Sequence, residues 1–218
     1  MQPAQDGLEF EVLVFVNGVE MTSQAAGMGM DPYEVFVPEN RLRTKSEPFE
    51  TPIARCNCGT YGCGSTDVRI TSDGNEVHWD WLIEKPSDRR ATFRRDQYEQ
   101  ELDALESFTQ WETPERTVGR LVLSGLDRAH LAAFGLRPSF VCNDWRDPSM
   151  FEVVLAYQDT HQIFLRFPWG NASPGGLSDT VASTLRQDPS TWTGTWHQCD
   201  PKDLRPPEFA RGWVRERL

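Results

Sequence analysis

Long hydrophobic runs are missing from this chain, although 38% of its 218 residues are hydrophobic. No stretch approaches the roughly 18 consecutive apolar residues that a membrane-spanning helix requires. The first ten residues, "MQPAQDGLEF", contain neither the basic residues nor the apolar stretch of a secretion signal. We therefore expect a cytoplasmic globular protein that makes no membrane contact.

Common catalytic motifs are missing too. The sequence contains no G-x-S-x-G, H-E-x-x-H, P-loop or G-x-G-x-x-G pattern, and these patterns mark many hydrolases, zinc proteases and nucleotide-binding enzymes. The histidines form no recognisable catalytic pair: His130 falls in a predicted helix, His161 begins a predicted strand, and His197 lies two residues from Cys199. These observations favour a protein that is not an enzyme.

Lysine and arginine are absent from residues 1–40, which contain seven acidic residues. The whole chain has a net charge of -11, which opposes binding to nucleic acid because that affinity depends on basic side chains. We expect no nucleic acid partner. The acidic N-terminal surface serves solubility in one interpretation and binds a basic protein partner in the other.

Cysteine is scarce, and its odd count of five argues against a complete disulfide framework. Cys56, Cys58 and Cys63 lie within "RCNCGTYGCG", residues 55–64. Because thiolates are the preferred ligands of structural zinc, these three residues predict a metal site.

Three thiols leave a tetrahedral zinc ion one ligand short, and the first pair has one intervening residue where zinc knuckles usually have two. A fourth ligand would come from a distant residue, namely Cys142, His161, His197 or Cys199. Alternatively, the glycines of this segment form a sharp loop and the thiols pack as small apolar groups. A third interpretation is an enzyme that uses the cysteine cluster, with or without zinc.

Strands are predicted in the first third of the chain. Apolar and polar residues alternate over residues 8–16, and Asn17-Gly18 follows as a hairpin turn, since both residues tolerate a positive φ. The segment "YEVFV", between Pro32 and Pro38, predicts another strand.

A second hairpin is predicted after the cysteine segment, from "DVRIT" and "EVHWDWL". A turn over residues 72–75 would pair Thr71 with Glu76 and place His78 opposite Arg69 on the outer face. The side chains predicted to face the core are Val68, Ile70, Val77, Trp79 and Trp81.

Helices are predicted over about 96–135. The first has a capping box at Asp96, the second begins at Thr113-Pro114 and the third at Asp127. A hairpin over residues 151–167 follows, then C-terminal helices at about 178–187 and from Pro207. This order predicts an α+β fold with mainly antiparallel pairing, as a single domain of residues 1–218 or as two tightly packed halves, 1–145 and 146–218.

The segment "CNCGTYGCG", with "VRITSDGNEVHWDW" and "WETPERTVGRLV" after it, resembles a group of uncharacterised bacterial proteins that is common in actinobacteria. That group shares a C-x-C-G-x-x-G-C turn, a hairpin ending in aromatic and acidic residues, and similar helices. The likeness weakens over "FEVVLAYQDTHQIFLRFPW" and does not extend to the first 40 residues. The resemblance implies a bacterial origin and the same fold, and it implies no activity.

Together these patterns predict a non-enzymatic cytoplasmic protein of the immunity or regulatory kind, which binds a basic partner through its acidic N-terminal surface. The alternative is an enzyme that uses Cys56, Cys58 and Cys63, with zinc as a candidate cofactor.

Overall fold

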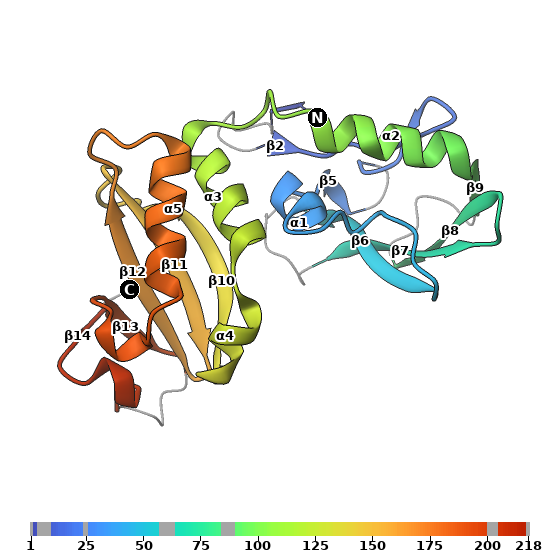
Figure 1. The fold of residues 1–218 in the computed structure, drawn as a ribbon. Coiled ribbons are helices and arrows are strands. Elements are labelled where there is room, and N and C mark those ends of the chain that lie inside the picture. Colours follow the sequence, from blue (N-terminus) through green and yellow to red (C-terminus); the bar gives the residue numbers. More distant parts are fainter. Residues whose placement is uncertain are drawn as a thin grey trace. The chain divides into compact units, whose positions relative to one another are not determined.

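The computed structural model describes residues 2–3, 10–23, 26–56, 64–83, 90–199 and 205–216, and its α+β architecture confirms the predicted fold class (Figure 1). The chain divides into two compact units, Met1–Trp111 and Glu112–Leu218. The two units meet in sequence between Trp111 and Glu112. Each unit is described by itself below.

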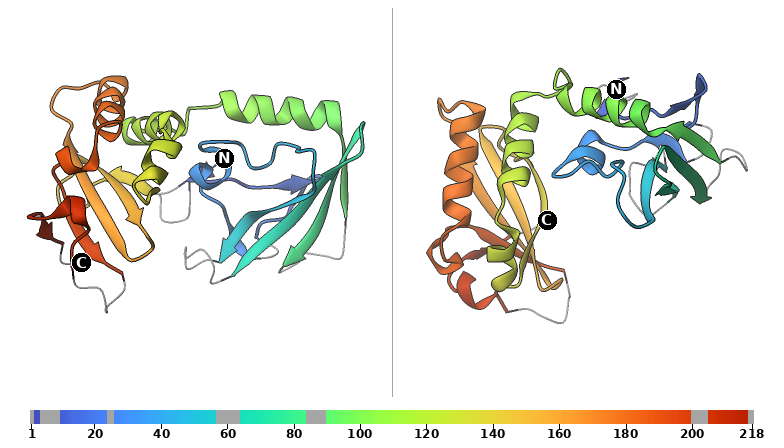
Figure 2. Two further views of the ribbon diagram at one scale, coloured as in Figure 1. Left: turned by 60° about the horizontal axis from the view of Figure 1, so that its bottom comes forward. Right: turned by 45° about the vertical axis from the view of Figure 1, so that its right-hand side comes forward.

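Unit 1 is built on a five-stranded antiparallel sheet whose strands follow one another in sequence order (Figure 2). Two short ribbons, β1–β2 and β3–β4, and two helices complete the unit. The sheet strands are β5 (Gly27–Gly29), β6 (Phe49–Cys56), β7 (Ser65–Ser72), β8 (Glu76–Ile83) and β9 (Ala91–Arg94). The other elements are β1 (Gln2–Pro3), β2 (Phe10–Glu11), β3 (Phe15–Val16), β4 (Val19–Glu20), α1 (Pro32–Phe36) and α2 (Arg95–Ser107).

The first predicted turn is confirmed, because β3 and β4 are joined at Asn17 and Gly18 with φ of 52° and 76°. The strand predicted after Pro32 is wrong, since this segment forms α1. The carboxylate of Asp31 accepts a hydrogen bond from the backbone N–H of Tyr33, and Pro32 occupies the first turn. These helix-start signals outweigh the β-branched residues of so short a segment.

The β7–β8 hairpin forms with a register displaced by two residues from the predicted one, since Thr71 pairs with His78 and not with Glu76. Side chains alternate between the two faces of a strand, so a shift of two leaves each residue on the predicted face. All the side chains predicted for the core are buried, namely Val68, Ile70, Val77, Trp79 and Trp81.

Helix α2 is attached to this core through Tyr98. The Trp79 indole N–H donates to the Tyr98 hydroxyl, which in turn donates to the carbonyl of Leu42. The capping box predicted at Asp96 is wrong, because the N-cap is Arg94 and makes no side-chain cap bond. Asp96 instead accepts hydrogen bonds from the side chain of Arg94 and the backbone of Gln97.

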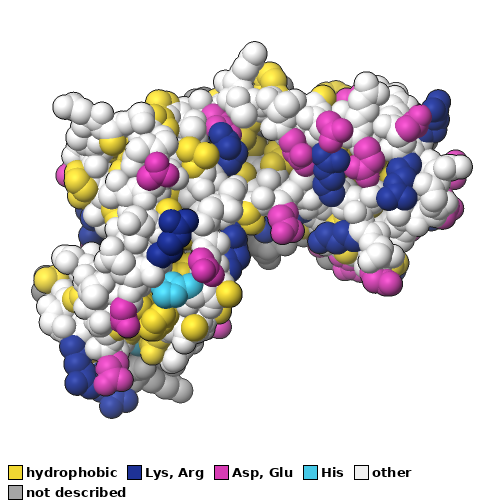
Figure 3. All heavy atoms as spheres, in the orientation of Figure 1, with side chains coloured by type: hydrophobic (Ala, Val, Ile, Leu, Met, Phe, Trp, Pro, Cys, Tyr) yellow, Lys and Arg dark blue, Asp and Glu magenta, His cyan; other side chains and the backbone are white. Residues whose placement is uncertain are grey.

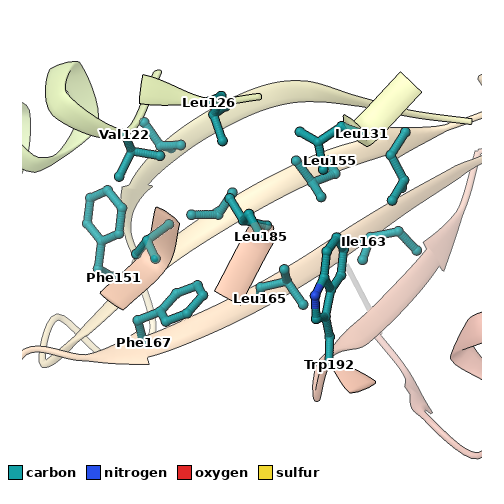
Figure 4. Packing of buried hydrophobic residues seen from close by; sticks show 14 of the residues in the cluster. Val122, Leu126, Leu131, Phe151, Leu155, Ile163, Leu165, Phe167, Leu185 and Trp192 are labelled. Atoms are coloured by element: carbon teal, nitrogen blue, oxygen red, sulfur yellow. The ribbon is translucent and has the colours of Figure 1, made fainter. Parts of the chain in front are cut away.

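Unit 2 contains a second five-stranded sheet, in which only the β13–β14 pair is parallel. Helices α3, α4 and α5 lie on one face of the sheet, and their apolar side chains pack against the central strands (Figures 1 and 4). The helical elements are α3 (Pro114–Gly125), α4 (Arg128–Ala133), α5 (Pro174–Leu185) and the 3-10 turns η1 (Pro189–Thr191) and η2 (Glu208–Ala210). The strands are β10 (Leu136–Asn143), β11 (Met150–Tyr157), β12 (His161–Pro168), β13 (Thr195–Gln198) and β14 (Val214–Arg215).

Local signals predicted most of unit 2. Thr113 and Asp127 cap α3 and α4 through their side chains, and Val153 pairs with Leu165 in the predicted hairpin, β11–β12. Helix α5 begins four residues earlier than predicted, because Ser173 supplies the cap. The helix predicted from Pro207 is reduced to the single 3-10 turn η2.

Candidate functional site

The structure describes only one of the three cysteines predicted to bind metal. Cys56 ends β6 and is disulfide-bonded, and its partner lies outside the described residues, as Cys58 and Cys63 do. A sulfur in a disulfide offers no thiolate to a metal ion. Zinc bound by Cys56, Cys58 and Cys63 therefore requires the reduced chain and stays a prediction.

The residues proposed as a fourth zinc ligand all lie in unit 2. Cys142 and Cys199 are free thiols. Burial, aided by the neighbouring Glu152 carboxylate, raises the pKa of Cys142 to about 11, so this thiol is protonated and unreactive at neutral pH. The rings of His161 and His197 meet backbone carbonyls, those of Arg205 and Glu216.

Three of the five acidic residues that the structure describes in the N-terminal region make hydrogen bonds within unit 1. Glu11 is buried and accepts a hydrogen bond from the backbone of Gly29, Glu20 accepts hydrogen bonds from the Thr22 and Ser23 backbone, and Asp31 caps α1. Of the five acids described in residues 1–40, Glu39 alone is exposed. The predicted acidic surface therefore has little support from these residues.

Exposed acids gather over α2 instead, where basic side chains are interleaved with them (Figure 3). Arg43 pairs with Glu99, Asp103 and Glu106 of this helix. Each carboxylate is at least a quarter exposed, so the ion pairs contribute little stability individually. Together the three ion pairs hold the segment of residues 40–44 against α2.

The polar face of the unit 2 sheet has a compact ion cluster, which we call the Arg166 cluster: Asp144, Glu152, Arg166 and Glu216. The Arg166 guanidinium lies 2.7 Å from Asp144, 2.8 Å from Glu152 and 3.2 Å from Glu216. The Arg166–Glu152 contact is an ion pair whose hydrogen-bond geometry is poor at the buried carboxylate oxygen.

The carboxylates of the Arg166 cluster differ in their pKa. Burial would raise the pKa of Asp144, but the backbone N–H of Arg146 and the Arg166 guanidinium more than offset it, and the pKa lies below its usual value. Burial would also raise the pKa of Glu216, but hydrogen bonds from the Thr195 hydroxyl and from Arg166 outweigh it, and the pKa lies below its usual value. Burial dominates at Glu152, whose pKa is raised. Arg166 contacts all three carboxylates, and we interpret the cluster as a structural support.

The Arg166 cluster contacts the loop between β10 and β11, and this loop contains an exposed tryptophan. Trp145 is 77% exposed, and the Arg146 guanidinium lies 4.4 Å from the centre of its ring. Arg146 also reaches Glu216 of the Arg166 cluster, at 3.3 Å. An exposed indole stacked with an arginine is typical of the residues that dominate protein–protein interfaces.

A third polar group lies at the turn of the β7–β8 hairpin, and we call it the His78 group: Asp73, Glu76 and His78. One ligand atom from each residue lies within 4.8 Å of the others. The His78 Nε2 atom is 3.2 Å from an Asp73 carboxylate oxygen and 4.0 Å from one of Glu76. Carboxylate oxygen and imidazole nitrogen are donor types that divalent transition-metal ions such as zinc accept.

A surface hollow of about 330 Å³ in unit 1 carries no comparable chemistry. Its lining has charges of both signs, Arg41 and Lys45 against Glu39 and Glu50. All four side chains are exposed. The hollow therefore selects no particular ligand charge.

The sequence reasoning missed both Trp145 and the His78 group. A tryptophan between Asn143-Asp144 and Asp147-Pro148 falls in a turn-forming segment outside any strand alternation, and this signal indicates an exposed indole. The His78 group depends on hairpin register, because only the observed register brings His78 beside the turn.

Comparison of the chain with protein-family models, with curated proteins and with solved structures finds no match. Among the helices in the described ranges, none is both long and apolar enough to cross a lipid bilayer.

Proposed function

We propose that this chain is a non-enzymatic protein-binding protein, of the immunity or regulatory kind, and that Trp145 and Arg146 anchor its partner. The observation that carries the proposal is the exposed Trp145 ring with Arg146 stacked on it. Tryptophan and arginine are the residue types most enriched among interface hot spots. The non-enzymatic part of the proposal rests on the sequence, which has no familiar catalytic motif.

Rigidity of the loop supports this role. Asp144 accepts a hydrogen bond from the backbone of Arg146, and Asp147 accepts two from Ser149. The backbone N–H of Trp169 fixes the loop from outside by donating to the carbonyl of Ser149. A loop that is already ordered loses less conformational entropy on binding, which favours affinity.

Net charge supports a basic partner. The net charge of the chain is -11, and long-range attraction between opposite charges accelerates association. Since the described N-terminal acids are mostly used within the fold, the complementarity we propose comes from the net charge of the whole chain, and Trp145 supplies the local anchor.

The test compares the wild-type protein with two single variants as baits in a lysate of the cells that produce it, at moderate salt. Trp145→Ala removes the exposed indole, and Val214→Ala is the matched control, because Val214 is also exposed, at 70%, and also lies in unit 2. We expect a protein that the wild type and Val214→Ala retain and that Trp145→Ala loses.

Thermal unfolding of the same proteins is the control for folding. Trp145→Ala should unfold within about 0.5 kcal/mol of the wild type, because the side chain is exposed. Equal capture by all three proteins, or no specific capture by any of them, contradicts the proposal.

A further inference from the structure

The His78 group differs from the other histidine environments of the chain. The rings of His130, His161 and His197 each meet a backbone carbonyl oxygen. His78 instead has two carboxylates of the described residues within 4.0 Å, at 3.2 Å and 4.0 Å, while being only 9% exposed. A nearly buried imidazole beside two carboxylates is an arrangement common in metal sites.

The ring of His78 is oriented from the neighbouring strand. Its Nδ1 atom lies 3.0 Å from the Thr92 hydroxyl on β9, so its Nε2 atom faces the turn. Hydrogen bonds of this kind to the second ring nitrogen orient metal-binding histidines and often change metal affinity by 10–100-fold when removed.

The two carboxylates lack a permanent positive partner within the described part of unit 1. Arg94 pairs with Glu76 across the β8–β9 ladder, yet its guanidinium binds Asp96. The Arg95 guanidinium donates a hydrogen bond to the carbonyl oxygen of Gly74 and not to the Asp73 side chain. Two carboxylates close together therefore have only one imidazole to balance them, which leaves an excess of negative charge.

The turn that carries these groups is well supported. The backbone N–H of Asp73 donates to the carbonyl of Glu76, and that of Arg95 donates to the carbonyl of Asn75. The positive φ of Gly74, 85°, lets the chain reverse within three residues. The ligand atoms are thus presented by a fixed backbone and not by an unsupported loop.

We propose that Asp73, Glu76 and His78 bind one divalent transition-metal ion of the zinc class, with water in the remaining coordination positions. Metal–ligand bonds of about 2.1 Å require donor atoms about 3.0–3.5 Å apart in a tetrahedral site. The 3.2 Å separation of His78 and Asp73 meets this requirement. The exposed Glu76 side chain needs to approach His78 by about half an ångström from its 4.0 Å separation, and all three ligand atoms already lie within 4.8 Å of one another. The imidazole favours zinc-class ions over magnesium and calcium, which prefer oxygen donors alone.

Calorimetric titration of the full chain with zinc chloride tests this site. The double variant Asp73→Asn/Glu76→Gln removes two ligands without changing side-chain size, and Glu47→Gln/Glu101→Gln is the matched control, since it neutralises two exposed carboxylates elsewhere in unit 1. All proteins retain the cysteine segment, so zinc bound there is the same in each. We expect the wild type and the control to bind one more zinc ion per chain than the ligand variant.

Thr92→Val is a second variant, which leaves all three ligands in place and removes only the hydrogen bond to His78. We expect it to retain the zinc stoichiometry with about tenfold weaker affinity. Circular dichroism checks that each protein is folded. Identical stoichiometry and affinity in the wild type and the ligand variant would overturn the proposal, and so would unchanged affinity in Thr92→Val.

Discussion

The two units each contain a polar cluster beside a hairpin connection, and the two clusters differ in the kind of basic group that faces the carboxylates. In unit 2 a guanidinium lies among three carboxylates and contacts each within 3.2 Å. In unit 1 two carboxylates face one imidazole. Since arginine carries its charge at every physiological pH, each carboxylate of the Arg166 cluster has a permanently charged partner. The described residues supply the His78 group with no such permanent cation, and for that reason we propose that it binds a metal ion.

The Arg166 cluster also explains why the nearby loop is available for binding. Arg166 holds Asp144, and Asp144 fixes the backbone of Arg146, so Trp145 projects from a supported turn. We infer that the Arg166 cluster stabilises this loop, whereas we propose that the His78 group binds a metal ion. The predictions below test this contrast.

The largest effect should come from Arg166→Met. The substitution leaves Asp144, Glu152 and Glu216 without their shared cation, and an uncompensated buried charge costs about 3–5 kcal/mol. Urea unfolding measures this loss in the free energy of unfolding. Arg137→Met is the control, because the Arg137–Asp159 pair is exposed and should contribute less than about 1 kcal/mol. Similar losses in both variants would show that the cluster has no special role.

Within the Arg166 cluster, Asp144→Asn should cost more stability than Glu152→Gln at pH 7. Asp144 accepts charge-assisted and backbone hydrogen bonds, and losing them costs about 1.5–3 kcal/mol. Burial raises the pKa of Glu152, so its ionised form is unfavourable in the fold, and glutamine should be neutral or stabilising. Chemical unfolding of both variants compares them, and the reverse order would contradict this account of the cluster.

Acid should weaken the wild type more than Asp144→Asn. The pKa of Asp144 lies below its usual value, because hydrogen bonds from Arg146 and Arg166 outweigh the opposing effect of burial. A lowered folded pKa stabilises the protein above the unfolded pKa, about 4, and this contribution disappears as the pH falls through the folded pKa. Thermal unfolding between pH 6 and pH 2.5 should therefore show a steeper decline for the wild type. Parallel curves would show that Asp144 does not titrate in this way.

The smallest effect should come from Asp73→Asn in metal-free protein. The substitution removes one of two carboxylates that lie close together at an exposed turn, so the free energy of unfolding should change by less than about 0.5 kcal/mol. Thermal unfolding in the presence of a chelator measures it. A loss above about 1 kcal/mol would mean that Asp73 and His78 form a structural ion pair, and the contrast with the Arg166 cluster would then fail.

Local sequence signals predicted much of the fold. Thr113-Pro114 and Asp127 begin helices where expected, and Asn17-Gly18 forms the expected turn. Alternation correctly placed Trp79 and Trp81 in the core, since it depends only on which face a residue occupies. The composition of "YEVFV", residues 33–37, favours a strand, but the Asp31-Pro32 cap begins helix α1 there.

The candidate sites were harder to predict, because they depend on features that alternation does not determine. The His78 group exists only in one hairpin register, and a shift of two residues leaves the pattern of buried residues unchanged. The Arg166 cluster joins residues 144 and 216, which are brought together by tertiary structure alone. The cysteine segment, which dominated the sequence reasoning, is represented among the described residues by Cys56 and its disulfide.

Zinc titration followed by amide NMR spectra of the reduced, folded chain tests the contrast most directly. Our account predicts that the amide signals of residues 73–78 and of Thr92 shift as zinc is added, while those of residues 144–147 and Arg166 stay in place. Unmoved signals at residues 73–78, or equal shifts at both clusters, would contradict it.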